Sequence, residues 1–314
     1  MELAKLTVAQ LKNLCKEQGI KGISTKNKKQ LIEILQPQAE QPQAEQLFQQ
    51  VIHDDILNVL PTLESDSAQI ILADPPYNIG KDFGNDSDKK TMGDYLAWCD
   101  KWIKESLRVL KPNGTMFVYG FSENLALILA RIPEEINRRW IIWNYTNKNV
   151  PSLNFWQRSH ESILVLWKSD KVFNRDSIRE PYTEGFLNGS VGKERKATPG
   201  RYGNKTTTYT AHANGALPRD VIKIPALAGG AGMKERVNHP TQKPLALCDK
   251  LIKSCKQSDG YILIPFAGSG SECVAAMNNG MSFIGVEING EYINLINERL
   301  QSSHYPNELE TGNQ

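Results

Sequence analysis

Short apolar runs alternate along most of the chain with segments whose apolar residues have helical spacing. The runs at residues 69–77, 114–120, 140–145, 161–168, 261–270 and 282–289 predict strands that end in turns. Helical spacing covers residues 91–111, 244–255, 271–280 and 291–300. Strands that alternate with helices favour an α/β fold, in which a mostly parallel sheet carries helices on both faces. We expect Pro112, Asn113 and Gly114 to form the turn that leads into the second strand.

The N-terminal part follows a different pattern, which predicts a separate small module. Two short amphipathic helices are expected there, the first capped by Thr7 and ended by Gly19, the second capped by Ser24 or Thr25. The unit QPQAE then occurs twice without any apolar period, which predicts an extended linker. The expected organisation is a module at 1–36, a linker at 37–46, a large domain at 47–304 and a tail at 305–314.

Residues 170–235 interrupt the alternation of strands and helices with a polar, basic and glycine-rich stretch. A segment of this length with few apolar residues is usually functional or disordered. Its aromatic residues either support a ligand or fill a local core, namely Tyr182, Phe186, Tyr202 and Tyr209.

Charge is spread unevenly in a chain whose formal net charge is only +2. Residues 1–35 hold seven Lys and Arg against three Asp and Glu, and residues 170–243 hold thirteen against seven. Two basic regions indicate contact with a polyanion in two places, although two solvated faces would give the same count.

The five cysteines form no CxxC or Cys/His cluster, so no metal site is expected. Scattered, unpaired cysteines also indicate that the protein works in a reducing cytosol. No transmembrane run and no secretory signal core is seen, so neither a membrane nor secretion is expected.

A glycine-rich turn follows the apolar run YILI late in the chain, in the sequence PFAGSGSE. Gly268 and Gly270 let the backbone approach a ligand, and the helix that follows presents free N–H groups. Glu287 ends the next strand nineteen positions after Gly268, near the spacing at which an acid reaches ribose hydroxyls. These features favour an adenosine-type cofactor over a strand-to-helix turn without a ligand. The Gly-Lys-Ser/Thr of a phosphate-gripping loop is missing, which disfavours ATP.

The sequence LADPPYNIG places an acid, two prolines and an aromatic residue at the end of a buried strand. The prolines stiffen the turn and remove two backbone donors, so that carbonyl groups face a ligand. Asp74 and the Pro75 carbonyl can then accept both hydrogens of an exocyclic amine, and Tyr77 offers a ring for stacking. Two acceptors draw the nitrogen toward tetrahedral geometry and raise its nucleophilicity.

Together, these motifs resemble those of the DNA amino-methyltransferases, which methylate adenine N6 or cytosine N4 with S-adenosyl-L-methionine. The order of a DPPY motif, a basic variable region, NHPTQKPL and a final FxGxG motif resembles their circularly permuted β group. The resemblance covers about residues 47–300 and implies a Rossmann-like class I methyltransferase fold. It also implies that the final two strands of the chain lie beside strands made earlier.

The resemblance implies roles for particular residues. The catalytic motif would be Asp74, Pro75, Pro76 and Tyr77. The cofactor would be bound by Asp55, Lys243, Phe266, Gly268, Ser269, Gly270 and Glu287. Asp55 would meet the adenine, with Asp54 as the neighbouring candidate, and Lys243 would lie near the methionine carboxylate. His160 and Glu161 match an HE pair of the family to which no chemistry is assigned.

One position departs from the family pattern. The family usually has Asp-Pro-Phe where this chain has Ile264, Pro265 and Phe266. The missing acid is expected near the methionine end of the cofactor. Its absence would weaken cofactor binding, or Asp74 and other groups would bind the amino group instead.

The N-terminal module resembles a SAP module, a helix–loop–helix unit associated with DNA binding. Leu11, Gly19, Gly22, Lys29 and Leu31 fall where that pattern expects them. A helical hairpin for protein contacts is the alternative.

The expected function is methylation of adenine N6 in double-stranded DNA, because the motif begins with Asp, where many N4 enzymes have Ser. A cytosine-N4 enzyme, a non-catalytic DNA-binding protein and an RNA substrate are the alternatives. Residues 170–235 would read the target sequence. A homodimer and a cognate restriction endonuclease are further partners to consider, and the resemblance places the protein in a prokaryotic or phage-type cytoplasm.

Overall fold

The computed structural model describes residues 3, 6–17, 20, 22–35, 47–81, 88–147, 152–196, 206–208 and 210–303. The chain divides into two compact units, Met1–Leu47 and Phe48–Gln314. The linker and tail expected at residues 37–46 and 305–314 lie outside the described residues, as do Gly19, Tyr202 and Tyr209. No helix in the described ranges combines the length and the apolar character needed to cross a membrane.

The first unit contains helices α1 (Val8–Glu17) and α2 (Lys28–Leu35), which pack against each other. Their small core is formed by Leu11, Cys15, Ile23, Leu31 and Leu35. Thr7 accepts a hydrogen bond from the Gln10 amide at 3.4 Å, as expected of a cap. The cap of α2 differs from the expectation of Ser24 or Thr25. Asn27 and Gln30 exchange backbone-to-side-chain hydrogen bonds of 3.1 Å, because an amide at each position completes a reciprocal capping box.

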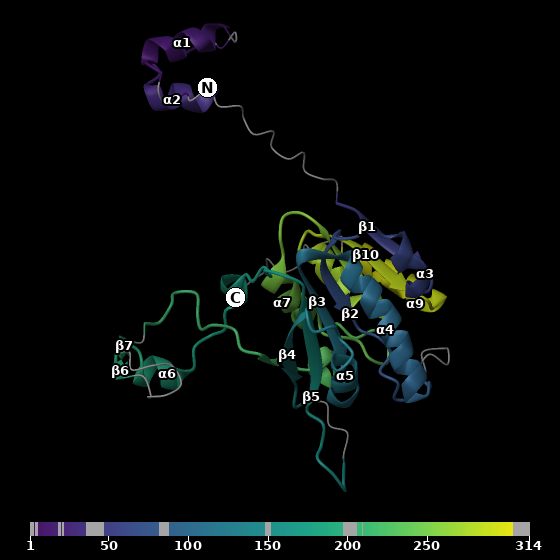
Figure 1. Ribbon diagram of the computed structural model, residues 1–314. Helices are drawn as coiled ribbons and strands as arrows, with labels where there is room; N and C mark the ends of the chain where they lie inside the picture. Colours follow the sequence, from purple (N-terminus) through teal and green to yellow (C-terminus); the bar gives the residue numbers. More distant parts are fainter. Residues whose placement is uncertain are drawn as a thin grey trace. The chain divides into compact units, whose positions relative to one another are not determined.

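The second unit is built on a sheet of eight strands in the order β1-β10-β9-β2-β3-β5-β4-β8 (Figure 1). Its strands are β1 (Gln49–His53), β2 (Ala68–Ala73), β3 (Leu110–Gly120), β4 (Asn137–Asn144), β5 (His160–Trp167), β8 (Val221–Lys223), β9 (Tyr261–Ile264) and β10 (Ser282–Glu287). Neighbours from β1 to β3 pair in parallel, whereas β5 lies antiparallel between β3 and β4. The strands β9 and β10 lie between β1 and β2, as the permuted order requires.

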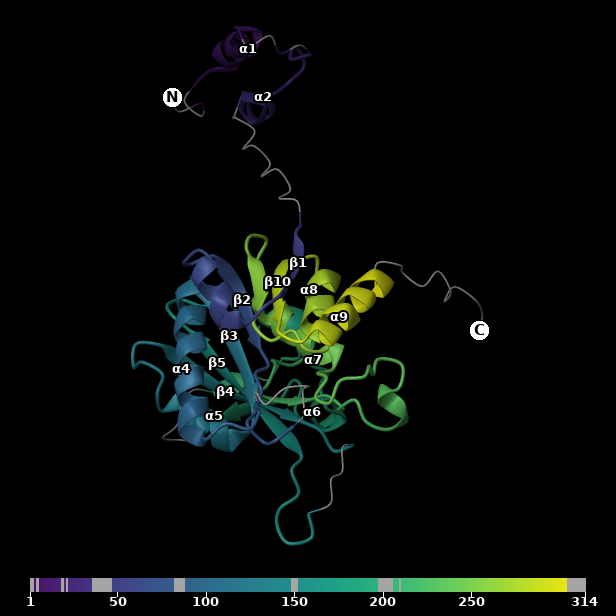
Figure 2. The same cartoon turned by 90° about the vertical axis from the view of Figure 1, so that its right-hand side faces the viewer.

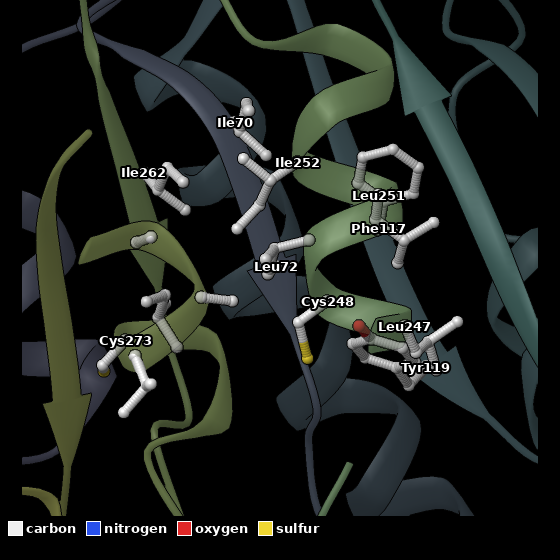
Figure 3. Packing of buried hydrophobic residues seen from close by; sticks show 14 of the residues in the cluster. Ile70, Leu72, Phe117, Tyr119, Leu247, Cys248, Leu251, Ile252, Ile262 and Cys273 are labelled. Atoms are coloured by element: carbon white, nitrogen blue, oxygen red, sulfur yellow. The ribbon is translucent and has the colours of Figure 1, made fainter. Parts of the chain in front are cut away.

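Helices cover both faces of this sheet (Figure 2). One face carries α3 (Ile56–Val59), α4 (Met92–Val109) and α5 (Ser122–Leu129), and the other carries α7 (Leu245–Cys255), α8 (Ser271–Asn278) and α9 (Gly290–Ser303). Strand side chains pack against α7 and α8 in the core shown in Figure 3. Apolar residues at successive turns of α7 face β2 and β3, namely Leu247, Cys248, Leu251 and Ile252. This dense core fixes the strand ends that form the cavity described below.

The expected turn at residues 112–114 is instead part of β3. Ala68 pairs with Leu110 and Ile70 pairs with Thr115, so four residues of β3 bulge opposite a single residue of β2. Gly114 is required in this bulge, since a Cβ there would lie 2.8 Å from the Gln69 carbonyl oxygen.

The segment at 170–235 contains short elements that the sequence did not indicate. They are α6 (Glu184–Gly189), the two-stranded pair β6 (Glu194–Lys196) and β7 (Thr206–Thr208), and β8 at the sheet edge. Tyr182 and Phe186 stack with ring centroids 4.7 Å apart, which favours a local core for these two residues.

Candidate active site

A cavity of about 1030 Å³ opens at the carboxyl ends of three parallel strands. Residues 74–77 follow β2, residues 265–269 follow β9, and residues 287–289 end and follow β10. Ligands of open α/β sheets bind at this edge, outside the carboxyl ends of the strands. Most of the site residues expected from the sequence line the cavity, namely Asp55, Asp74, Pro75, Pro76, Tyr77, Phe266, Gly268, Ser269 and Glu287. Lys243 and Gly270 are not among the lining residues.

In the turn after β2, the carbonyl of Pro75 is available to a ligand. The Pro76 carbonyl accepts the Tyr95 hydroxyl at 3.0 Å, and the Tyr77 carbonyl accepts the side-chain amide of Asn124. No described residue donates a hydrogen bond to the Pro75 carbonyl. Since Pro75 also lines the cavity, its carbonyl oxygen can accept a hydrogen from a bound amine.

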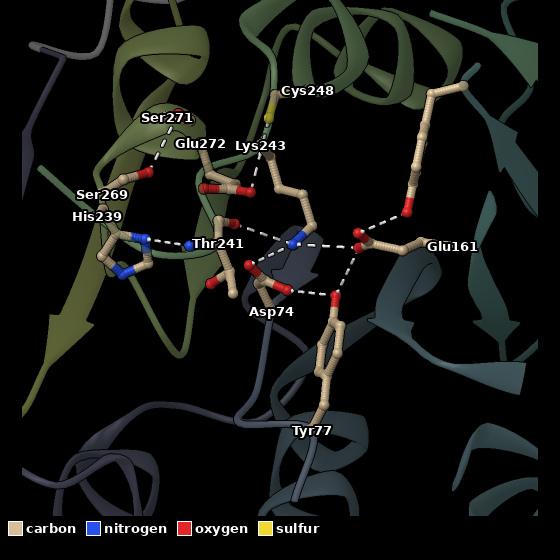
Figure 4. Close-up of polar contacts among 11 residues, drawn as sticks. Asp74, Tyr77, Glu161, His239, Thr241, Lys243, Cys248, Ser269, Ser271 and Glu272 are labelled. Carbon is tan, nitrogen blue, oxygen red and sulfur yellow. Dashed lines mark hydrogen bonds and ion pairs between the residues drawn. The ribbon is translucent and has the colours of Figure 1, made fainter. Parts of the chain in front are cut away.

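Asp74 lies next to this carbonyl and is held by two donors (Figure 4). Its carboxylate accepts the Tyr77 hydroxyl at 2.8 Å and pairs with the Lys243 ammonium at 2.8 Å. Burial raises the pKa of Asp74, and the nearby Lys243 opposes this rise. The ammonium thus favours the ionised carboxylate, which is the form that accepts hydrogen bonds from an amine.

Glu161 supports the same residues from behind and was left without a role by the sequence. Its carboxylate accepts the Tyr77 hydroxyl at 3.1 Å and lies 3.5 Å from the Lys243 nitrogen. The Tyr145 hydroxyl reaches its other oxygen at 3.5 Å. The available signal was a carboxylate at the start of an otherwise apolar strand, because a buried acid requires partners.

Lys243 is buried behind the cavity, between two carboxylates. Its side chain is only 2% exposed and its ammonium bridges Asp74 and Glu161. Burial lowers the pKa of Lys243, but the two carboxylates outweigh burial and raise the pKa above its ordinary value. A contact with a methionine carboxylate therefore stays a prediction, while the structure shows Lys243 orienting the acids.

The glycine-rich turn after β9 approaches the cavity closely. Gly268 has a φ of +47°, and a Cβ there would lie 3.0 Å from the His239 ring nitrogen Nε2. Phe266 packs against Trp98 and Trp102, with ring centroids 5.5 and 5.2 Å away. Gly270 instead caps the start of α8 at a φ of +76°, against Ile296.

Glu287 is fixed by backbone amides at the other end of the cavity. The amides of Gly268 and Asn289 each donate to one of its carboxylate oxygens at 2.8 Å. Burial raises the pKa of Glu287, and these backbone hydrogen bonds oppose the rise. A carboxylate held in this way is ready to accept hydrogen bonds from the hydroxyl groups of a sugar.

Asp54 and Asp55 both line the cavity beside β1. Asp55 caps α3 by accepting from the Leu57 amide at 2.9 Å. Asp54 accepts from the Asn58 side chain and the Asp55 amide, and these hydrogen bonds lower its pKa. Both acids are therefore oriented by local hydrogen bonds.

Glu272 is a further lining residue that sequence reasoning missed. It lies in the first turn of α8 and is 3% exposed. Burial and the neighbouring Asp74 raise the pKa of Glu272 to about 7. The available signal was an acid immediately after the glycine turn, in a chain that has Ile264 where the family resemblance implies an acid.

Known structures share this fold. The PvuII DNA methyltransferase, described as cytosine-N4-specific, aligns with a TM-score of 0.55 at 15% identity, over 82% of this chain and 87% of that one. The Thermus thermophilus protein TTHA0409, complexed with S-adenosyl-L-methionine, aligns with a TM-score of 0.51 at 20% identity, over 81% and 93%. The large unit therefore has the Rossmann-like fold of the class I methyltransferases.

Sequence comparison defines the family within this class. Residues 68–298 match the family described as DNA methylase. The chain is 32% identical to the DNA adenine methyltransferase YhdJ of Escherichia coli K12, over 81% of this chain and 84% of the relative. It is 30% identical to the type II methyltransferase M.HpaI of Haemophilus parainfluenzae, over 81% and 74%. The chain belongs to the DNA methylase family, whose methyl donor is S-adenosyl-L-methionine.

The N-terminal unit matches a different family from the one expected. Residues 2–43 match the family described as Rho termination factor, N-terminal domain. The resemblance to a SAP module is not confirmed, and DNA binding by this unit stays a prediction.

The cavity wall has the chemistry that S-adenosyl-L-methionine requires. The cofactor carries a sulfonium and an ammonium group, and the wall presents seven carboxyl side chains, those of Asp54, Asp55, Asp74, Asp88, Glu272, Glu287 and Glu291. The glycine turn lets the ligand approach the backbone closely, and Phe266 adds an aromatic surface. The residues present therefore fit this cofactor.

Proposed function

We propose that the protein methylates the N6 amine of adenine in double-stranded DNA. The observation that carries the proposal is the pair of acceptors at the end of β2. The Asp74 carboxylate is oriented by Tyr77 and Lys243, and no described residue donates to the Pro75 carbonyl. An adenine amine carries two hydrogens, and the two acceptors can each receive one. The adenine specificity of YhdJ supports the choice of base.

In the proposed mechanism the cofactor, when bound, would supply an electrophilic methyl group, and the chain's residues position and activate the amine. The N–CH₃ bond would form as the S–CH₃ bond breaks, which leaves S-adenosylhomocysteine, and the amine would pass its surplus proton to the Asp74 carboxylate and from there to solvent. Asp74 and the Pro75 carbonyl draw the amine hydrogens aside, which frees the nitrogen lone pair from the ring. Lys243 and the Tyr77 hydroxyl hold Asp74 in place, and Glu161 holds both of these donors. Orientation and electrostatics supply the acceleration without a covalent enzyme intermediate.

The proposed cofactor residues divide between the two ends of the cavity. Glu287 binds the ribose, Asp55 lies at the adenine, and Phe266, Gly268 and Ser269 line the path between them. Gly270 contributes by starting α8, whose N-terminus faces the site.

A DNA base reaches this cavity only after it leaves the helical stack. We place the duplex against the loop between β4 and β5, which starts at the same sheet edge as the cavity. The loop exposes three large apolar side chains, with Leu153 93%, Phe155 80% and Trp156 88% exposed. Apolar side chains are commonly inserted where a base has left the stack. Residues 170–235 are the proposed sequence-reading region.

Nucleoside analysis tests the proposed reaction. DNA is incubated with the protein and S-adenosyl-L-methionine, digested and examined by mass spectrometry. We expect N6-methyladenine, and N4-methylcytosine alone would overturn the choice of base. Cofactor binding without any methylated nucleoside, on DNA of varied sequence, would favour the non-catalytic alternative. The same assay with RNA in place of DNA tests the alternative that the substrate is RNA.

The remaining partner predictions concern assembly. A homodimer and a cognate restriction endonuclease follow from the family resemblance alone, and light scattering of the purified protein tests the first of them.

A further inference from the structure

The carboxyl group of Glu272 lies in the cavity wall with little to stabilise it. Glu272 is 3% exposed, and the Cys248 thiol donates a hydrogen bond to its carboxyl group at 3.6 Å. Among the described residues, no Lys or Arg side chain forms an ion pair with it. A buried acid without a cationic partner is costly, so its presence in a ligand cavity calls for an explanation.

Glu272 marks the end of the cavity where the methyl group is transferred. The charges of Asp74 and Lys243 act on it, and Figure 4 shows Glu272 beside these two residues. Glu287, by contrast, is surrounded by backbone amides and His53. Since Glu287 is the proposed ribose partner, Glu272 lies on the methionine side of the cofactor.

Ile264 packs on the same side of the sheet as Glu272. It is fully buried in the cluster that contains Cys248 and Cys273. Cys248 contacts Glu272, and Cys273 is the next residue after it in the sequence. The family resemblance implies an acid at position 264, where this chain has Ile264, and Glu272 follows eight positions later. Strand β9 and the first turn of α8 thus direct side chains toward one region.

Buried charges in this region are unbalanced. Asp74, Glu161 and Glu272 are carboxyl groups, and Lys243 pairs with the first two. Arg299 is the other nearby cation, and its guanidinium donates to Ser269 and Ser271. A ligand cation next to Glu272 would correct this imbalance.

We propose that Glu272 binds the ammonium group of the methionine part of S-adenosyl-L-methionine, in place of the acid that the family resemblance implies at position 264. The inference rests on the proposed function and adds a cofactor contact to it.

Two ligands that differ only at the amino-acid end test this contact. S-adenosylhomocysteine has the ammonium group, and 5′-methylthioadenosine lacks the amino-acid end. For Glu272→Gln, calorimetry should show S-adenosylhomocysteine affinity reduced about 10- to 100-fold, since hydrogen bonds to charged groups have this strength. The affinity for 5′-methylthioadenosine should stay within about twofold of the wild type.

Glu298→Gln is the matched control, because it removes the same charge from an exposed position of α9. It should bind both ligands as the wild type does. Unchanged S-adenosylhomocysteine binding in Glu272→Gln would overturn the inference. An equal loss for both ligands would overturn it as well, because that result indicates a structural role.

A double variant tests whether the acid can return to its usual place. Ile264→Asp combined with Glu272→Gln should recover at least part of the lost S-adenosylhomocysteine affinity. A folded double variant, judged by circular dichroism, that binds no better than Glu272→Gln would count against the shared position. If the wild type binds neither ligand, the cofactor site of the proposed function fails, which is a different result from either of these.

Discussion

Asp74, Lys243, Glu161 and Tyr77 form a buried network of hydrogen bonds and ion pairs inside the protein. Such a network is rigid because each buried polar group needs its partners, and a movement that breaks one contact leaves a group buried and unpaired. Rigidity is useful for this reaction, since the acceptors must hold the amine nitrogen in line with the methyl group.

Asp74→Asn is the first prediction at the residue scale. The amide keeps the shape of the side chain but places an NH₂ group or an uncharged oxygen where the carboxylate was. We expect the single-turnover rate of methyl transfer to fall by at least about 100-fold, the usual effect of removing one oriented electrostatic contact. S-adenosylhomocysteine binding, measured in parallel, should change far less, and a variant with the wild-type rate would show that Asp74 is the wrong acid.

Glu272→Gln also has a predicted effect on stability. The pKa of Glu272 is about 7 in the folded protein against an ordinary value of 4.5, so the folded state holds this proton more tightly. Folding stability from this group therefore decreases as pH rises from about 4.5 to about 7 and is constant above that range. The variant, which cannot ionise, should be more stable than the wild type at pH 8 by up to about 3 kcal/mol. The difference should shrink at about pH 5.

Urea unfolding without ligand at both pH values measures this difference. The groups that face Glu272 from neighbouring elements are Asp74, Lys243, Cys248, Tyr119 and Arg299. Since the variant leaves all of them in place, a variant that is less stable than the wild type at pH 8 would contradict the buried, charged state of this acid.

At the scale of elements, the alternation of apolar runs and helical segments was enough to predict the strands and helices around the site. Strand β2 and helix α4, for example, lie where the pattern places them. Glu161 and Glu272 were not predicted as site residues, because their importance depends on contacts with residues far away in the sequence. The cap at Asn27 and the bulge in β3 were missed because side-chain pairing and sheet register decide them.

The loop between β4 and β5 carries the prediction at this scale. Phe155→Ala combined with Trp156→Ala should raise the KM for DNA about tenfold, because the exposed rings are proposed to contact the opened duplex. S-adenosylhomocysteine affinity should not change, since neither residue lines the cavity. Leu127→Ala, in an exposed position of α5, is the control. An unchanged KM for DNA in the double variant would separate this loop from the DNA.

At the scale of the whole molecule, the division into two compact units allows each to be tested alone. A chain of residues 48–314 should bind S-adenosylhomocysteine with unchanged affinity, because every residue that lines the cavity is present. Its DNA affinity should fall, and the salt dependence of binding should become less steep. The reason is that the removed residues 1–47 hold seven Lys against five Glu, a net excess of two positive charges.

Fluorescence anisotropy at several salt concentrations measures both quantities. If the full-length and the shorter chain have equal DNA affinity and equal salt dependence, the N-terminal unit does not contact DNA. That result would favour the alternative in which its helical hairpin contacts another protein. Loss of cofactor binding in the shorter chain would instead show that the two units cooperate.

The position of β9 and β10 between β1 and β2 has a consequence for synthesis of the protein on the ribosome. While β9 and β10 are still being translated, β1 has no neighbour in the sheet and β2 has an unpaired edge toward it. The glycine turn and Glu287 belong to the same late segment. The nascent chain thus has its amine-activating residues long before it can hold a methyl donor, and the open edge of β2 is the surface that a chaperone would have to protect.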